Sequence, residues 1–151
     1  MFNNYLNNYE YLNNFDYLNL CLKMIVSDPL NLKIIENPSF IVIEEALRKN
    51  GLALQFVKEQ SENLCLLAIQ QNGLALQYVK NQNKELCINA VQNNGLALKY
   101  VLVKTNFICN EAIKQNSEAI QFINNPSDDL IILSLKDNIN NSKFIDNTKK
   151  R

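Results

Sequence analysis

The feature that most constrains this chain is an internal repeat with a period of 22 residues. An alanine column marks the repeat at Ala46, Ala68, Ala90 and Ala112, and the same register continues to Met24 and Ser134. Four residues later a second column contains Asp28, Asn50, Asn72, Asn94, Asn116 and Asn138. A regular period of this size is typical of solenoid proteins, in which each unit is too small to fold alone and buries its apolar face against its neighbours.

The register divides the chain into six units, residues 16–37, 38–59, 60–81, 82–103, 104–125 and 126–147. Residues 1–15 come before them and a basic tail, 148–151, follows. In the first segment apolar residues recur every three or four positions, which predicts a helix that caps the first unit. These residues are Phe2, Leu6, Tyr9, Leu12 and Phe15. At the other end Glu118 and Asn140 replace the core leucine column, and Asn141 and Ser142 come next. Such substitutions predict a polar outer cap.

Each unit is predicted to contain two short helices. The first follows a residue type that caps helix N-termini. These candidate caps are Ser39, Ser61, Asn83, Thr105 and Ser127. The apolar residues of the first helix fall at i, i+1, i+4 and i+5, as in Leu64-Cys65 and Ala68-Ile69, which makes one buried stripe. We expect the Asn-Gly pair to end this helix through a left-handed backbone conformation. The second element, Leu-Ala-Leu-x-aromatic-Val, is short enough to be either α-helical or 3-10 helical.

These patterns predict an all-α fold, a short α-solenoid of six two-helix repeats. Residues 86–101 read LCINAVQNNGLALKYV, and residues 63–79 follow the same pattern. Both stretches resemble the repeat family named domain of unknown function 4116, and the likeness covers about residues 42–123. The resemblance implies helical repeats of unassigned activity, found in large DNA viruses of protists and in bacteria, and carries over no catalytic residue. The alternation of a longer and a shorter helix is also similar in pattern to leucine-rich repeat variant arrays.

The composition argues against an enzyme. The chain has no histidine, and therefore lacks the commonest general base and metal ligand. Its three glycines form no phosphate-binding loop. With 15 basic and 15 acidic residues the net charge is zero, so a protein is a better candidate partner than nucleic acid. The sequence has no apolar run long enough to cross a membrane and does not begin like a secretory signal, so we expect an intracellular protein. Because it lacks histidine and a phosphate-binding loop, we also expect no cofactor. The excess of asparagine fits the AT-rich genome of a viral source.

The four cysteines fall in one column of the repeat, at Cys21, Cys65, Cys87 and Cys109. Two other units have Ile43 and Ile131 at this position. Equivalent positions on stacked helices lie roughly 8–10 Å apart, too far for the sulfurs to share one metal ion or to form disulfides. We therefore predict that the cysteines are apolar core residues in a reducing compartment.

Two further patterns have both structural and functional explanations. An aromatic column is expected to pack in the core, although it could instead form a stacking platform for a base or another ligand. It consists of Phe56, Tyr78, Tyr100, Phe122 and Phe144. The carboxylate pairs Glu44-Glu45 and Asp128-Asp129 are expected at helix starts, where they face the positive end of the helix dipole rather than act as acid and base.

The remaining polar positions define the candidate contact surface. Polar pairs follow the alanine column at Arg48-Lys49, Gln70-Gln71, Gln92-Asn93 and Lys114-Gln115. A Lys/Gln column on the second helix contains Lys33, Gln55, Gln77, Lys99, Gln121 and Lys143. We predict that the partner-binding face consists of Gln55, Gln77, Lys99, Gln121, Lys58 and Lys80. A plain solvated face would show the same pattern.

The function that fits this array is a non-enzymatic scaffold that offers an extended surface to a protein partner. Two alternatives stay open. A helical repeat protein can read RNA or DNA with one polar pair per repeat. The chain can also be a structural component that assembles with itself.

Overall fold

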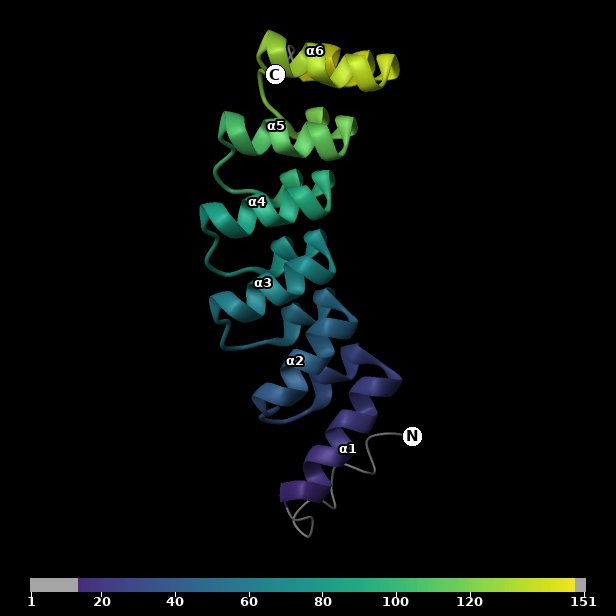
Figure 1. The fold of residues 1–151 in the computed structure, drawn as a ribbon, viewed down its shortest axis with the longest axis vertical. Helices are drawn as coiled ribbons and strands as arrows, with labels where there is room; N and C mark the ends of the chain where they lie inside the picture. Colours follow the sequence, from purple (N-terminus) through teal and green to yellow (C-terminus); the bar gives the residue numbers. More distant parts are fainter. Residues whose placement is uncertain (1–13, 149–151) are drawn as a thin grey trace.

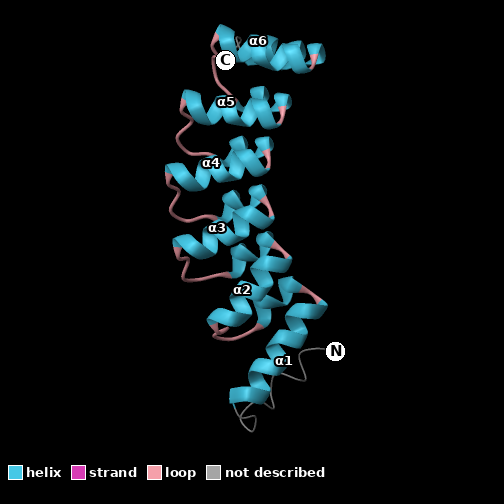
Figure 2. Cartoon of the chain, viewed as in Figure 1, coloured by secondary structure: helices cyan, strands magenta, loops and turns pink. Residues whose placement is uncertain are grey.

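The structure is a computed structural model that describes residues 14–148. Every regular element in this range is a helix, and no strand occurs within it (Figures 1 and 2). We label α-helices α and 3-10 helices η. The elements are α1 (Asn14–Ser27), η3 (Pro29–Ile34), α2 (Phe40–Lys49), η4 (Gly51–Phe56), α3 (Glu62–Gln71), η5 (Gly73–Tyr78), α4 (Lys84–Asn93), η6 (Gly95–Tyr100), α5 (Asn106–Gln115), η7 (Ser117–Phe122), α6 (Asp128–Asp137), η8 (Ile139–Asn141) and α7 (Ser142–Thr148).

The α-helices are stacked along the long axis of the molecule (Figure 1). From α2 to α6 each helix begins 22 residues after the previous one. Each α-helix from α1 to α6 is followed by a 3-10 helix, and the loops from η4, η5, η6 and η7 to the next α-helix lie on the left side of the view (Figure 2). α3, for example, packs against α2 and α4 and against the 3-10 helices η4 and η5. The predicted all-α solenoid is therefore confirmed.

The N-terminal cap stays a prediction, because Phe2, Leu6, Tyr9 and Leu12 lie outside the described residues. Phe15 belongs to α1 and is exposed. Farther along α1, Cys21 and Ile25 are buried in the core, and the helix packs against α2. Residues 149–151 of the basic tail also lie outside the described part of the chain.

The second helix of each inner unit is a 3-10 helix, which answers a question that the sequence left open. η4, η5, η6 and η7 each have six residues. The preceding asparagine caps the helix: Asn72 Oδ1 accepts the N–H of Leu74 at 3.0 Å. At the other end the N–H of Val79 donates to the Leu76 carbonyl at 3.1 Å. Local side-chain and backbone bonds therefore stabilise both ends of a very short helix.

The prediction that Asn-Gly ends the α-helix in a left-handed conformation was wrong. The asparagine is extended, with φ near −150° at Asn72 and at its equivalents, and none of the three glycines, all of which are described, has a positive φ. The N–H of Asn72 donates to the Ala68 carbonyl at 2.9 Å, so this residue ends one helix and begins the next. Among the described non-glycine residues the left-handed ones are Asn37 and Asn125, each followed by a proline.

The glycine is needed because two repeats approach closely at this point. A Cβ atom on Gly73 would lie 2.5 Å from the carbonyl oxygen of Ala90 in the next unit, and Gly51 and Gly95 face the same kind of carbonyl. Backbone atoms at this distance cannot move aside cheaply. The position is buried, so glycine serves here for its small size rather than for its backbone freedom.

The predicted N-caps are confirmed in three of five units. Ser61, Asn83 and Thr105 accept the N–H three residues on, at 2.8–3.3 Å. Ser39 and Ser127 adopt the same extended backbone without a capping side-chain bond within the described structure. Both serines follow a proline that follows a left-handed asparagine.

A continuous apolar core runs between the α-helices and the 3-10 helices. The alanine column is fully buried at Ala46, Ala68, Ala90 and Ala112, which lets neighbouring helices lie close together. Large residues next to it are also fully buried, among them Leu47, Leu54, Ile69, Leu76, Val91, Leu98 and Ile120.

The C-terminal end departs from the repeat. Glu118 and Asn140 are exposed, as expected of a polar outer cap. Asn141, predicted to belong to that cap, is instead buried with 1% of its surface exposed, and its Nδ2 donates to the carbonyl and hydroxyl oxygens of Ser134. Its 3-10 helix stops after three residues and α7 follows, so that Ile145 is buried and α7 packs against η7.

Candidate interaction surface

The predicted Lys/Gln column lies on the exposed side of the 3-10 helices. Gln55, Gln77, Lys99 and Gln121 are the fifth residues of η4 to η7, and all four are exposed. In the three glutamines, Nε2 donates to the carbonyl three residues earlier at 3.0 Å. Each glutamine is thereby held in the same orientation, and its amide oxygen is left to accept a bond from an external donor.

Two of the three lysines of this column lie over neighbouring rings. Lys99 Nζ is 5.6 Å from the centre of the Tyr100 ring, and Lys143 Nζ is 4.7 Å from that of Phe144. Lys33, in η3, is exposed. A cation over an aromatic face is held by the ring quadrupole, so Lys99 offers a positioned charge in the middle of the glutamine column.

Lys58 and Lys80 lie elsewhere, in the loops that follow η4 and η5. Both are exposed, and Lys80 Nζ donates to the Lys58 carbonyl of the preceding unit. They line a surface pocket of about 520 Å³ together with Glu59 and Glu62. The six predicted residues therefore form two groups, four on the 3-10 column and two on the loops.

The aromatic column lies between the Lys/Gln column and the core. Phe56, Tyr78, Tyr100, Phe122 and Phe144 are all half-buried and pack against the buried cluster. The expected core role is therefore correct for part of each ring. The remaining ring surface borders the exposed glutamines and adds apolar contact area to this face.

The polar pairs that follow the alanine column do not form a uniform surface. In three of the four pairs the second side chain bonds to the previous repeat: Gln71 Oε1 accepts the Gly51 N–H at 2.6 Å, and Asn93 Oδ1 accepts that of Gly73 at 2.7 Å. Gln115 accepts the Gly95 N–H in the same way. These amides satisfy buried backbone groups, so they are structural rather than available for recognition.

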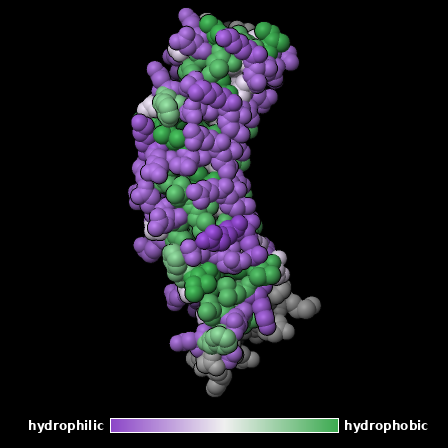
Figure 3. Space-filling view, viewed as in Figure 1, coloured by the Kyte–Doolittle hydropathy of each residue, from purple (hydrophilic) through white to green (hydrophobic). Residues whose placement is uncertain are grey.

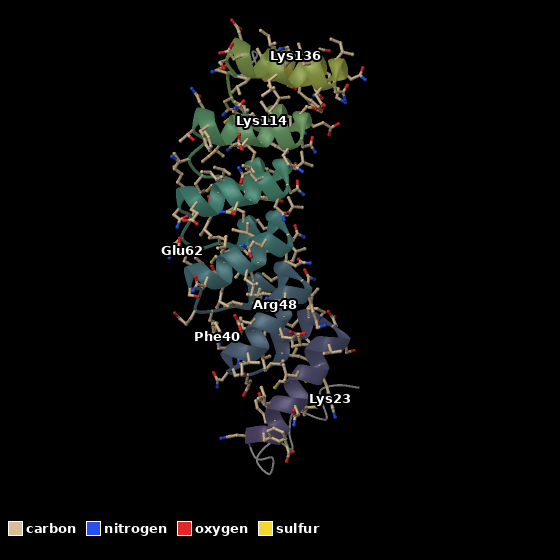
Figure 4. The ribbon with its side chains drawn as sticks, in the orientation of Figure 1. Lys23, Phe40, Arg48, Glu62, Lys114 and Lys136 are labelled. Atoms are coloured by element: carbon tan, nitrogen blue, oxygen red, sulfur yellow. The ribbon has the colours of Figure 1, made fainter. Side chains whose placement is uncertain are left out.

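The first members of the pairs lie on the exposed side of the α-helices, which we call the α-helix face. This face is mostly hydrophilic (Figure 3). Arg48, Lys114 and Lys136 point outward from α2, α5 and α6 (Figure 4). Glu111 bonds to Gln92 and Lys114, at 2.8 and 2.9 Å, and these two partners lower the pKa of its carboxyl group. This face therefore carries local ion pairs, such as Glu111 with Lys114, and its side chains differ from one unit to the next.

Sequence reasoning missed the glutamines that begin the third and fourth units. Gln60 Nε2 donates to the Tyr78 carbonyl and its Oε1 accepts the Lys80 N–H, both at 3.0 Å. Gln82 makes the same two bonds to Tyr100 and Leu102 of the next unit. The other units have Asp16, Pro38, Lys104 and Pro126 at this position. Because this column varies, no repeated residue type pointed to its role.

The carboxylate pairs behave differently from each other. Asp128 and Asp129 lie in the first turn of α6, as expected. Glu44 and Glu45 were wrongly assigned to a helix start, because α2 begins at Phe40 and places them in its middle. Glu45 instead pairs with Lys49 one turn later, at 3.3 Å.

The four cysteines are buried free thiols in the apolar column, so the predicted packing role is confirmed. Burial raises the pKa of each thiol, most simply at Cys87, where desolvation is the cause. Within residues 14–148 no group of three or more metal-ligating side chains comes together.

We expect these thiols to react slowly in the folded protein. The thiolate is the reactive form of a cysteine. The raised pKa lowers the fraction of each cysteine that is thiolate, and burial keeps the reagent away from the sulfur. At pH 8 the folded chain should react with a disulfide reagent such as DTNB at least roughly tenfold more slowly than the urea-unfolded chain, because reaction must wait for local opening. Four equivalents that react at once in the folded state would contradict the burial of this column.

No helix among the described residues is long and apolar enough to span a membrane.

Searches against known proteins place the chain in a family. A family model described as "Domain of unknown function (DUF4116)" matches three overlapping windows, residues 40–82, 61–107 and 83–127. No curated protein and no solved structure matches the chain significantly. Because the matched windows together span more than half of the 151 residues, the chain belongs to the DUF4116 repeat family.

Proposed function

We propose that this chain is a non-enzymatic scaffold that binds an extended segment of a protein partner along its 3-10 helices. The observation that carries the proposal is the column Gln55, Gln77, Lys99 and Gln121, which presents one polar side chain per repeat in a fixed orientation. Side chains already held in place lose little conformational entropy on binding.

The spacing of the column suits an extended peptide. Neighbouring packed helices lie about 8–10 Å apart, and an extended chain advances about 3.3 Å per residue, so one repeat corresponds to about three peptide residues. Amide oxygens can accept backbone N–H groups of such a segment, and the half-buried rings beside them can contact its apolar side chains.

The chemistry of the chain supports a binding role over catalysis. The sequence has no histidine, and its thiols are buried with raised pKa values, so they are poor nucleophiles. We further propose that the chain acts inside a cell. We also propose a viral source, as the family resemblance implies, and therefore a host or virion protein as the candidate partner.

The test compares the two faces of the array. The triple variant Gln77→Glu, Lys99→Glu and Gln121→Glu changes the 3-10 face, whereas Arg48→Glu, Gln70→Glu and Lys136→Glu add similar negative charge to the α-helix face. We expect proteins captured by the wild-type chain from its native host to be lost with the first variant and retained with the second. Equal retention by both variants would show that the 3-10 face is the wrong one.

Capture of RNA instead of protein would also overturn the proposal. Such binding would weaken steeply with salt, because phosphate contacts release counterions. The zero net charge and the structural role of Gln71, Asn93 and Gln115 both argue against it.

A further inference from the structure

The loops and the N-terminal ends of α2 to α5 form one side of the molecule, which we call the loop edge (Figure 1). Phe40 of α2 and Glu62 of α3 lie on it one unit apart (Figure 4). The edge includes the first two residues of each helix from α2 to α5 and the loop residues that follow η4, η5 and η6. It lies apart from the Lys/Gln column and the α-helix face.

Large apolar side chains are exposed at both ends of this edge. Phe40 and Ile41 at the start of α2 are 55% and 57% exposed. Leu102 and Val103, in the loop before α5, and Phe107, in α5 itself, are 76%, 74% and 52% exposed. Figure 3 shows hydrophobic side chains on the left edge at the level of α2 and again at the level of α5, with hydrophilic ones between them. Exposed apolar clusters of this kind mark interaction sites.

The two units between these clusters carry charge at the same positions. Glu62 stands in α3 where α2 has Phe40, and Lys84 stands there in α4. Both side chains are exposed. Lys84 Nζ lies 5.9 Å from the centre of the Phe107 ring, and Glu62 accepts a bond from Asn83. An acidic group at the start of α3 and a basic group at the start of α4 therefore lie on neighbouring units between the two apolar clusters.

This order is self-complementary under a twofold rotation. Consider an axis that lies in the plane of contact, passes between α3 and α4 and is perpendicular to the long axis of the molecule. Rotation about it places α2 of one copy opposite α5 of a second copy, and α3 opposite α4. Ile41 then meets Phe107 of the second copy, and Glu62 meets its Lys84, twice in the symmetric pair. A parallel arrangement would instead place each Glu62 opposite another Glu62, which like-charge repulsion disfavours.

We propose that the loop edge joins two antiparallel copies of this chain about an axis between α3 and α4. Five large apolar side chains per copy are covered in this arrangement, two of them phenylalanines, the kind of residue that dominates interface cores. The same register places Lys58 opposite Lys80 of the second copy, and the Lys80 ammonium group bonds to the Lys58 carbonyl of its own chain. The dimer leaves both Lys/Gln columns open, so it goes beyond the proposed scaffold function and would double its valency.

The first measurement is the molecular mass across a range of concentrations, by size exclusion with light scattering. We expect the wild-type chain to approach twice its 17.4 kDa at high concentration. Leu102→Asp with Phe107→Asp should return it to the mass of one chain, whereas Arg48→Glu on the α-helix face should not. A wild-type chain that stays monomeric throughout the range would overturn the proposal.

Charge exchange tests the antiparallel register itself. Glu62→Lys alone or Lys84→Glu alone should raise the dissociation constant about tenfold or more, because each places like charges opposite each other. The double variant should dimerise like the wild type, and an equimolar mixture of the two single variants should form a mixed dimer. Single variants that weaken the dimer without rescue in the double variant or the mixture would overturn this register. Far-UV circular dichroism checks that each variant is folded.

Discussion

Replacing Leu76 by alanine is expected to lower the free energy of unfolding by about 2–5 kcal/mol. Leu76 is fully buried in η5, and this helix packs against η4, η6, α3 and α4. The shortened side chain leaves a cavity at the centre of the stack, where the neighbouring backbone is held on both sides and cannot fully collapse. Urea unfolding followed by far-UV circular dichroism measures the change.

The matched control is Val26→Ala in α1. Val26 is 64% exposed, so its truncation should change the unfolding free energy by no more than about 0.5 kcal/mol. Because each repeat is stabilised mainly by its neighbours, we also expect Leu76→Ala to broaden the transition as the two halves of the array begin to unfold separately. Equal losses in the two variants would contradict the stacked core.

Gly73→Ala is expected to destabilise the chain by about 1–3 kcal/mol, or more if the repeats separate. The new methyl group would lie 2.5 Å from the Ala90 carbonyl oxygen and 3.0 Å from the Asn94 nitrogen, both of them backbone atoms. Moving the repeats apart would also stretch the 2.7 Å bond from the Gly73 N–H to Asn93. Thermal and urea unfolding of the purified variant measure the loss.

The sign of this effect distinguishes close packing from backbone flexibility. Where a glycine has ordinary φ and free space, alanine stabilises a protein by about 0.4–1 kcal/mol, because it restricts the unfolded chain. Ser117 is the natural control, since this unit already carries a Cβ atom at the same position. Ser117→Ala removes the hydroxyl bond to Asp137, and should cost only about 0.5–1.5 kcal/mol. A Gly73→Ala variant as stable as the wild type would show that the repeats have room to separate.

Much of the fold could be predicted because its main signals are local and repeated. The alanine and cysteine columns mark the buried stripe, and the residue types at Ser61, Asn83 and Thr105 mark helix starts. Errors arose where a residue type has two local uses. Asparagine before glycine commonly ends a helix in the left-handed region, yet Asn72 is extended because its side chain caps the next helix.

The candidate site was predictable in position but not in detail. The exposed column on the second helices follows from the 22-residue register. The bonds that orient Gln55, Gln77 and Gln121 depend on the 3-10 geometry, which a six-residue pattern does not distinguish from α. Lys58 and Lys80 were predicted on the same face as this column, whereas the structure places them in the loops after η4 and η5, on the loop edge.

The sequence by itself determined the repeat, its register and which columns are apolar, since periodic burial leaves a periodic pattern of residue types. Only the tertiary structure shows that the glycine after asparagine lies against the carbonyl of the next repeat, and that Gln71 and Asn93 bond to backbone N–H groups of the previous one. It also shows that Asn141 is buried. The physical reason is distance along the chain. Gln71 and Gly51 are 20 residues apart, and their contact exists only once two repeats have stacked closely enough for an amide to reach a backbone N–H.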